Sequence, residues 1–515
     1  MRGDFSITSK LGLAAPLLFH LAIPTWATLT RTAGLGLNRE TSWMFSALYP
    51  QIYLNPAYAS TEKSRFVADF HNLAGDLAAQ GALYLAWGKH TVGLLLGERA
   101  SEVIWNTPEH PLSFFYTANT ATQYVPDNRF IDPAHYLRIN TAIVNSAGLA
   151  LSDSATIFEP NYNPLTTKNA ELIYTWSLGE FIVGAKAGLA HSHLQKERKT
   201  KLLSEDINLL KMQIPFSAGI LWESKRPFLR SFDVAYHYDR YILANRYDEK
   251  DLQGRQVLAE LRDRGAYDQK IQAKVSLALL QNHLFHVRVQ YGWSNTSTTA
   301  RAKSEINTLC TVFTDCYFDL EDSYQRLGQQ FSLGFSDEIR HDKNFVWFFG
   351  LLWQREEIHN SFDGYNYHTH TKREDATPYG NKAPVMQSFS LNELPIFLGL
   401  EGKIHEKISI RFGLNHALIN RRKNLSGLAA YREKTISQRR SAGGYVYQTM
   451  EIERKGQAGV LSQAALGLSI LPTENFSLDW LLNYAMLTQG PHALSGKMLE
   501  FSFAVGLTYI FADEI

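Results

Sequence analysis

The sequence is poor in cysteine: among its 515 residues only Cys310 and Cys316 occur, with five residues between them. Protein zinc sites need paired Cys-x-x-Cys units or additional histidines, so this spacing excludes a zinc site built on cysteine. In an oxidising compartment the two thiols can close a small disulfide loop. We therefore expect a disulfide between Cys310 and Cys316 if the chain is exported.

Long apolar runs are also missing. After residue 27 no run approaches the roughly 20 apolar residues that a membrane-spanning helix requires. The mean hydropathy is −0.22, which excludes a bundle of such helices. The formal net charge is only +1, which argues against a nucleic-acid partner, because such proteins usually carry a basic excess.

Sequence motifs of enzymes are absent as well. There is no Gly-x-Ser-x-Gly elbow, no His-Glu-x-x-His pair, no Walker loop and no dinucleotide fingerprint. We therefore predict no catalytic residue, no metal ligand and no cofactor, and we expect a protein that is not an enzyme.

Two features are present in their place. Residues 1–27 have the form of a secretory signal, with Arg2 and Lys10 ahead of an apolar core at 11–23 and small residues ending at Ala27. Aromatic residues are frequent, with 29 Phe, 25 Tyr and 10 Trp. An outer-membrane barrel needs aromatic girdles at both membrane interfaces, while its alternating polar residues keep the mean hydropathy low.

The mature chain repeats segments in which apolar and polar residues alternate. The clearest hairpin is 270–294, where odd-numbered residues such as Val275 and Val289 are apolar and even-numbered ones such as Lys274 and Arg288 are polar. Successive side chains of a strand point to opposite faces, so each strand has one apolar and one polar surface. The segment Phe345 to Trp353 departs from this pattern, because it is apolar on both faces.

Short turns and long polar stretches separate these segments in alternation. The short turns fall near 88–90, 179–180, 224–227, 281–283, 341–344, 405–407 and 472–474. The long stretches are 100–169, 195–209, 246–268, 296–323, 360–384, 421–456 and 488–496. Short periplasmic turns and long extracellular loops are typical of outer-membrane barrels. We predict an all-β fold, an antiparallel transmembrane β-barrel of about 14–16 strands over residues 65–511, followed by a short extension at 512–515.

The alternation also predicts which polar side chains face the barrel lumen. The candidates are Lys186, Asp233, His237, Asp239, Lys270, Lys274, His286, Arg288, Arg411, Asp479 and Glu500. Both signs of charge are present, whereas a strongly ion-selective ring needs one sign to dominate. Such charges either line an aqueous path or pair with each other.

The last strand, Met498 to Phe511, resembles the C-terminal signature of outer-membrane barrels, although four residues follow the final aromatic. That resemblance implies the barrel assembly machinery as a partner during biogenesis. Near the mature N-terminus, the segment from Tyr53 to Ala59 resembles the Asn-Pro-Ala element of the FadL-like outer-membrane transporter superfamily. In that superfamily the element lies in or beside an N-terminal plug. Asn55-Pro56 is also a common turn-forming pair.

Residues 28–64 carry many large apolar side chains without strand alternation. Contiguous exposed apolar patches are rare unless they bind something, so we expect this segment to fold into the lumen as a plug, with Asn55 and Pro56 making the turn into the wall; the alternative is a periplasmic segment. The basic clusters at 196–199, 421–423 and 439–440 either remain solvated or contact lipopolysaccharide phosphates.

These observations favour a bacterial outer-membrane barrel that acts as a channel or transporter for small molecules, including hydrophobic ones, embedded in membrane lipid and lipopolysaccharide. The alternative is a non-conducting barrel with a structural or adhesin-like surface role. The sequence does not identify a substrate.

Overall fold

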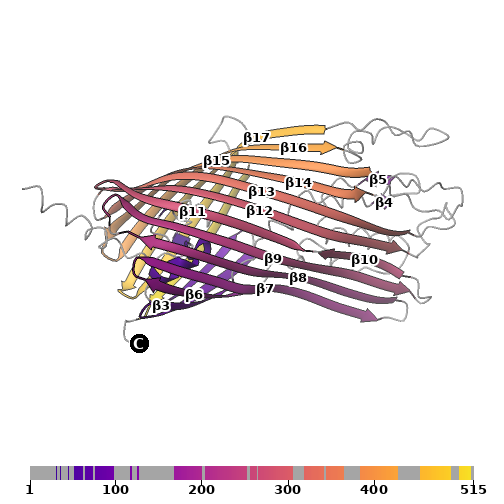
Figure 1. The fold of residues 1–515 in the computed structure, drawn as a ribbon, viewed down its shortest axis with the longest axis horizontal. Coiled ribbons are helices and arrows are strands. Elements are labelled where there is room, and N and C mark those ends of the chain that lie inside the picture. The colour runs from indigo at the N-terminus through magenta and orange to yellow at the C-terminus, as the bar shows by residue number, and fades with distance from the viewer. Residues whose placement is uncertain are drawn as a thin grey trace, which may run out of the picture.

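The computed structural model describes residues 30–31, 35, 44–45, 51–61, 64–73, 76–97, 116–118, 124–126, 168–199, 203–224, 226–251, 256–263, 265–304, 318–341, 344–364, 383–426, 453–488 and 498–511 (Figure 1). The proposed signal segment, Cys310, Cys316 and residues 512–515 lie outside these ranges. The secondary structure comprises α4 (Gln51–Leu54), η1 (Pro56–Thr61), β1 (Arg65–Leu73), β2 (Asp76–Trp87), β3 (His90–Leu96), β4 (Tyr116–Ala118), β5 (Tyr124–Pro126), β6 (Lys168–Leu178), β7 (Phe181–Lys199), β8 (Leu203–Glu223), β9 (Leu229–Asp251), β10 (Gln256–Asp263), β11 (Ala266–Leu280), β12 (His283–Ser304), β13 (Phe318–Arg340), β14 (Phe345–Gly364), β15 (Ala383–His405), β16 (Ile408–Ser426), β17 (Glu453–Thr473), β18 (Phe476–Thr488) and β19 (Met498–Ile510).

The main sheet closes on itself. β1 pairs with β2 on one side and with the last strand, β19, on the other, so that Arg65 lies opposite both Tyr84 and Ile510. Every pairing in this sheet is antiparallel and joins strands that are neighbours around the barrel. Closure removes the exposed strand edges that an open sheet would present. The predicted all-β antiparallel barrel is confirmed.

The sheet contains 17 segments but 16 strand positions, because β10 and β11 are successive parts of one strand. Both parts pair with β9 and with β12. Between Asp263 and Ala266 this strand has one residue more than β9, which makes a β-bulge, and Gly265 adopts φ 146° there. An extra residue reverses which side chains face the lumen, so the alternation changes phase at this point.

Seven connections of two to five residues gather at one end of the barrel, at 88–89, 179–180, 224–228, 281–282, 341–344, 406–407 and 474–475. We call it the turn end; it lies at the left in Figure 1, and the C-terminus is marked there. All seven fall within or beside the short turns that the sequence predicts. The opposite end is called the far end.

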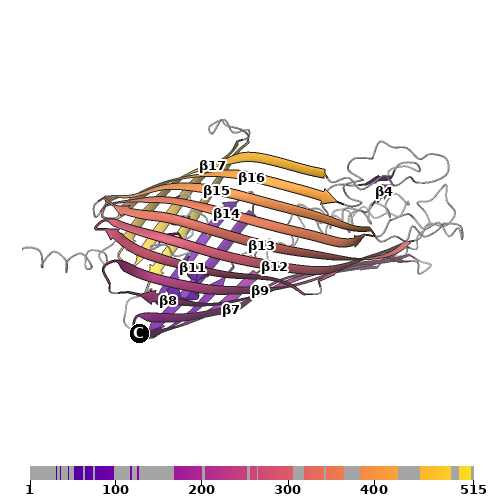
Figure 2. The same cartoon turned by 45° about the horizontal axis from the view of Figure 1, so that its top comes forward.

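Several long polar stretches predicted as loops are instead largely strand. β7 and β8, of 19 and 21 residues, are joined by 200–202, well inside the predicted loop 195–209. β9 and β10 likewise run through most of 246–268. These stretches are polar because the outer face of the wall meets water there, and they remain strands. Figure 2 shows the long strands continuing toward the far end, where the small hairpin β4–β5 also lies.

The rule of long outer connections also fails between β1 and β2. β1 and β2, of 9 and 12 residues, are joined at the far end by residues 74–75 alone. The wall is therefore much shorter at β1–β3 than at β7–β17, where the continuous strands have 19–23 residues.

A band of exposed apolar side chains surrounds the outer face. On β7 the outward residues are apolar from Phe181 to Leu189 and then change to His191 and His193. This band of nine residues matches the ~9–11 residues that a tilted strand needs to cross a bilayer. On β14, Trp347, Phe349, Leu351 and Trp353 make the same band. The closed antiparallel wall and its apolar outer band have the architecture of a transmembrane β-barrel.

We expect Val289→Arg to destabilise the folded barrel by ~2–4 kcal/mol, because it places a charge near the middle of the lipid-facing band. Val289 is 40% exposed on the outer face of β12. Urea unfolding in liposomes, followed by tryptophan fluorescence, measures this change. Val289→Leu, the apolar control, should leave the free energy of unfolding close to that of the wild type. Equal free energies of unfolding for the two variants would mean that the register assigned to β12 is wrong.

Candidate functional site: the barrel lumen and the segment that crosses it

The described residues of 30–61 lie inside the barrel. Two short helices lead into the wall, and Asn55 stands between them. Its backbone N–H donates to the Gln51 carbonyl oxygen at 2.7 Å, which closes α4, and its Oδ1 accepts from the Ala57 N–H at 3.0 Å. Asn is a favoured residue for such a cap, and Pro56 suits the first helical position because its missing N–H needs no partner.

Asn55 also attaches this turn to the wall. Its Nδ2 donates to the carbonyl oxygens of Ile220 on β8, at 3.3 Å, and Val234 on β9, at 3.4 Å. Glycines make the close approach possible. A Cβ at Gly219 would overlap Asn55 Oδ1, and a Cβ at Gly184 would lie 2.5 Å from the Ala57 nitrogen. The Asn-Pro-Ala element therefore packs into a part of the wall that lacks side chains.

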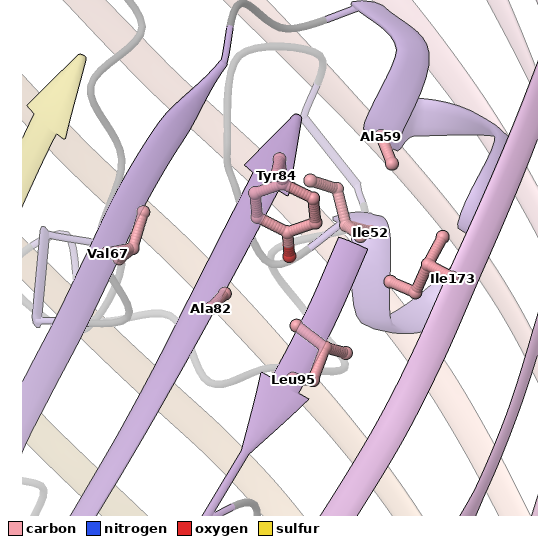
Figure 3. Close-up of a cluster of buried hydrophobic side chains, with 7 residues drawn as sticks. All are labelled: Ile52, Ala59, Val67, Ala82, Tyr84, Leu95 and Ile173. Atoms are coloured by element: carbon pink, nitrogen blue, oxygen red, sulfur yellow. The ribbon is translucent and has the colours of Figure 1, made fainter. Parts of the chain in front are cut away.

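Apolar contacts hold the two short helices on one side of the lumen. Ile52 and Ala59 pack against Tyr84 of β2, Leu95 of β3 and Ile173 of β6 (Figure 3). Tyr84 and Ala59 are completely buried. The inner face of these strands therefore carries an apolar surface, which the helices cover.

A second apolar cluster lies against β14 and β15. Leu35, Met44 and Phe45 pack onto the inner face of the wall, where Phe348 and Leu352 are buried. The rings of Phe45 and Phe348 meet edge to face, with centroids 5.3 Å apart. This cluster explains why the segment Phe345 to Trp353 is apolar on both faces: one face meets lipid and the other meets the N-terminal segment.

Arg31 enters a buried network of charges. Its guanidinium lies 2.7 Å from Oε2 of Glu401 on β15, and Oε1 of the same carboxylate accepts from Arg411 on β16 at 2.9 Å. Arg411 also pairs with Asp479 on β18 at 3.1 Å. Two cations and two anions therefore balance, and charge-assisted hydrogen bonds of this kind are the strong ones. Nearby, Thr30 donates through its N–H and hydroxyl to Asp69 of β1.

A second polar group lies beside η1. The Tyr58 hydroxyl donates to Asp233 Oδ2 at 2.6 Å, and Lys274 lies 3.7 Å from the same oxygen. The Lys274 ammonium also lies 5.1 Å from the centre of the Tyr58 ring. Burial and the adjacent carboxylate raise the pKa of the Tyr58 phenol well above its usual value, so Tyr58 remains a hydrogen-bond donor.

Further contacts complete the circuit of the wall. Gln272 of β11 donates to the Leu54 carbonyl oxygen, and Ser336 of β13 donates to that of Met44. The N-terminal segment thus contacts the inner faces of β1–β3, β6–β9, β11 and β13–β15. It reaches opposite sides of the lumen at one level, nearer the turn end.

The predicted lumen residues fall into three groups. Buried in the structure are Lys186, Asp233, Lys274, His286, Arg288, Arg411 and Asp479. Partly buried are His237, Asp239 and Lys270. Glu500 lies in β19, and its side chain is outside the described residues. Asn55 and Pro56 are both buried, at the turn between α4 and η1.

Most of these charges have partners from neighbouring strands. Lys186 lies 2.6 Å from Glu171 of β6, and His286 Nε2 lies 3.2 Å from Glu338 of β13. His237 shares a hydrogen bond of 2.8 Å with Ser217. Sequence reasoning named the cations and missed three acidic partners, Glu171, Glu338 and Glu401. Alternation along β13 and β15 could have found Glu338 and Glu401, because each lies an even number of residues after another position that faces the lumen.

Gly219→Val tests the fit of Asn55 against the wall. We expect the added side chain to push Asn55 out of its seat and to raise ion conductance in planar bilayers, while the barrel still folds. Gly81→Val is the matched control, because a Cβ at Gly81 would meet no atom closer than 3.4 Å. If both variants conduct like the wild type, the fit of Asn55 does not hold the segment in place.

Within the described ranges, no group of three or more His, Cys, Asp or Glu side chains could hold a metal ion. A helix long and apolar enough to cross a membrane is likewise not found among the described residues. The described part of the site is thus a set of N-terminal residues packed on the inner face of the wall, beside buried charges that pair with one another.

No protein-family model and no curated protein matches the sequence. Solved structures that resemble the fold include the CymD monoaromatic hydrocarbon channel, at 10% identity over 96% of this chain and 100% of that chain, with a TM-score of 0.37. The Pseudomonas putida toluene transporter TodX matches at 9% identity over 91% and 95%, with a TM-score of 0.36. A Pseudomonas aeruginosa FadL homologue matches at 8% identity over 95% and 99%, with a TM-score of 0.41. At these scores the likeness carries no functional argument.

Proposed function

We propose that the protein is an outer-membrane channel or transporter for small molecules, with a lumen that its N-terminal segment closes near the periplasmic side. The turn end faces the periplasm in this proposal, because short turns are periplasmic in outer-membrane barrels. The observation that carries it is the pair of contacts on opposite sides of the wall: Arg31 with Glu401 of β15, and Asn55 with the carbonyls of β8 and β9.

The inner wall favours hydrophobic cargo over sugars or ions. The apolar surface at Tyr84, Leu95 and Ile173 is covered by the N-terminal segment, so movement of that segment would expose it to the lumen. A polar-solute channel gains nothing from such a surface, whereas a hydrophobic molecule gains about 25 cal/mol per Å² of apolar area that it buries.

Uptake in proteoliposomes tests this function. We expect protein-dependent entry of labelled toluene into vesicles, and little swelling of the same vesicles in glucose or arabinose. Tyr84→Asp should reduce toluene entry several-fold, whereas Tyr84→Phe, which keeps the buried apolar ring, should not reduce it. Swelling in sugars without toluene entry would contradict the hydrophobic route.

A non-conducting barrel with a structural or surface role is the second candidate. The buried network of Arg31, Glu401, Arg411 and Asp479 favours it, because a charge-balanced and largely buried cluster can serve rigidity alone. The length of β7–β17, which carries the wall well beyond the apolar band, also suits contact with other surfaces. If vesicles with the folded, reconstituted protein show no toluene entry and no swelling in sugars, that result supports this candidate.

A further inference from the structure

The outer face of β14–β17 carries an open groove of about 570 Å³ at the far edge of the apolar band. Trp353, Leu394, Leu418 and Val460 line its apolar part. Trp353 and Leu418 are 39% and 43% exposed, so the groove opens outward, toward lipid. Its volume lies within the range of about 300–1,000 Å³ that is usual for ligand sites.

Small side chains create the groove. The outward positions of β17 near it are Ala458 and Val460, and Gly459 lies between them. On β14, by contrast, the large ring of Trp353 stands at the same level and forms one side of the groove. The difference in side-chain size across these four adjacent strands thus leaves the groove on the outer surface of the wall.

The chemistry of the groove changes at its far edge. Pairing places Leu394, Leu418 and Val460 in one row across the strands. The next outward row, about 6.6–6.8 Å farther along, contains Arg355, Asn392, Asn420 and Ala458. An apolar row is therefore followed at once by a row in which Arg355, Asn392 and Asn420 carry hydrogen-bond donors.

Arg422 stands in the row beyond, on β16. It is exposed, and its partners in the neighbouring strands are Ser390 and Gly456, which carry no charge. Arg355, on β14, donates from Nε to Glu357 Oε1 at 2.9 Å, which fixes its guanidinium but offsets its charge. Arg422 thus supplies the net positive charge at this end, and Asn392 and Asn420 lie between it and the apolar groove.

We propose that this groove binds lipid A: an acyl chain lies along Trp353, Leu394 and Leu418, and a phosphate of the headgroup is held by Arg422 with Asn392 and Asn420. Arginine pairs well with phosphate, and its planar fork permits two parallel hydrogen bonds. The groove lies at the edge of the band away from the turn end, which is the outer leaflet in the orientation given under the proposed function. In an outer membrane that leaflet consists of lipopolysaccharide, whose lipid A carries both acyl chains and phosphates. The proposal does not depend on whether the lumen conducts.

Native mass spectrometry of the full-length barrel in mild detergent tests the proposal. The probes are bis-phosphorylated lipid A, the same lipid without phosphates, and phosphatidylglycerol. We expect the wild type to retain one lipid A, and Arg422→Ala to reduce the bound fraction at least fivefold. Ala458→Phe, which fills the groove, should have the same effect. Lys199→Ala is the matched control, because Lys199 is an exposed cation at the far end of β7, distant from the groove.

Equal retention of lipid A by the wild type, Arg422→Ala and Ala458→Phe would overturn the proposal. So would equal binding of phosphatidylglycerol or dephosphorylated lipid A, since the groove would then be a general contact for lipid. Heat-dependent migration on detergent gels verifies that each variant is folded before its lipid is counted.

Discussion

Deleting residues 28–50 should convert a barrel of low conductance into an open pore. The deletion removes Thr30, Arg31, Leu35, Met44 and Phe45, which cover the inner face of β1 and β13–β15. Water then reaches Glu401, Arg411 and Asp479, and ions gain a polar path beside α4 and η1. Single-channel recording in planar bilayers should show stepwise conductance many-fold above that of the full-length protein.

The control replaces residues 28–50 with a Gly/Ser segment of equal length, which preserves chain length but not the apolar and charged contacts. It should conduct like the deletion. Both variants must show heat-dependent migration, so that an unfolded barrel is not counted. Unchanged conductance in a folded deletion variant means that residues 28–50 do not close the lumen.

Glu401→Gln should strongly destabilise the folded barrel. Glu401 accepts from both Arg31 and Arg411 and is 2% exposed, so loss of its charge leaves two buried guanidinium groups with one remaining carboxylate, that of Asp479. Removing one partner of a buried ion pair costs about 3–5 kcal/mol. Urea unfolding of the reconstituted barrel measures this loss.

Glu357→Gln is the matched control for this measurement. Glu357 pairs with Arg355 on the outer surface, where both side chains are substantially exposed, and such pairs contribute only about 0–1 kcal/mol. Equal losses for Glu401→Gln and Glu357→Gln would show that the Arg31–Glu401–Arg411–Asp479 network does not stabilise the barrel.

The wall could be predicted from the sequence because each spanning strand separates two different environments. In the hairpin 270–294 the register pairs Lys274 with Arg288 and Val275 with Val287, which puts like faces together as the alternation requires. Lipid on one side and a polar interior on the other impose a period of two on the sequence, and the tight turns mark where it restarts. Val275 and Lys274 alone therefore indicate the facing of β11.

Other features depend on contacts that no local pattern encodes. Beyond the lipid band both faces of a strand are polar, so β7 past Leu189 has the composition of a loop. The bulge at Gly265 lies in such a stretch and shifts the alternation without an apolar residue to report it. The apolar side chains of Phe348 and Leu352 face inward because they pack with Phe45, which lies about 300 residues earlier in the sequence.

The charges of the lumen illustrate the same limit. The alternation indicates that Lys274 and Arg411 point inward, but not that Asp233 and Glu401 lie beside them on adjacent strands. Because these ion pairs are buried, removal of either partner leaves an uncompensated charge.

The most direct test of the central claim is a cross-link between the N-terminal segment and the wall. Asn55→Cys combined with Gly219→Cys, in a chain with Cys310→Ser and Cys316→Ser, brings the two thiols together, because the Asn55 side chain fills the space at Gly219. Mass spectrometry of peptides from the folded, unreduced barrel should find this disulfide, and should find none when Asn55→Cys is combined with Gly81→Cys. Free thiols at both positions of the first pair, in a folded barrel, would contradict placement of the segment inside the lumen.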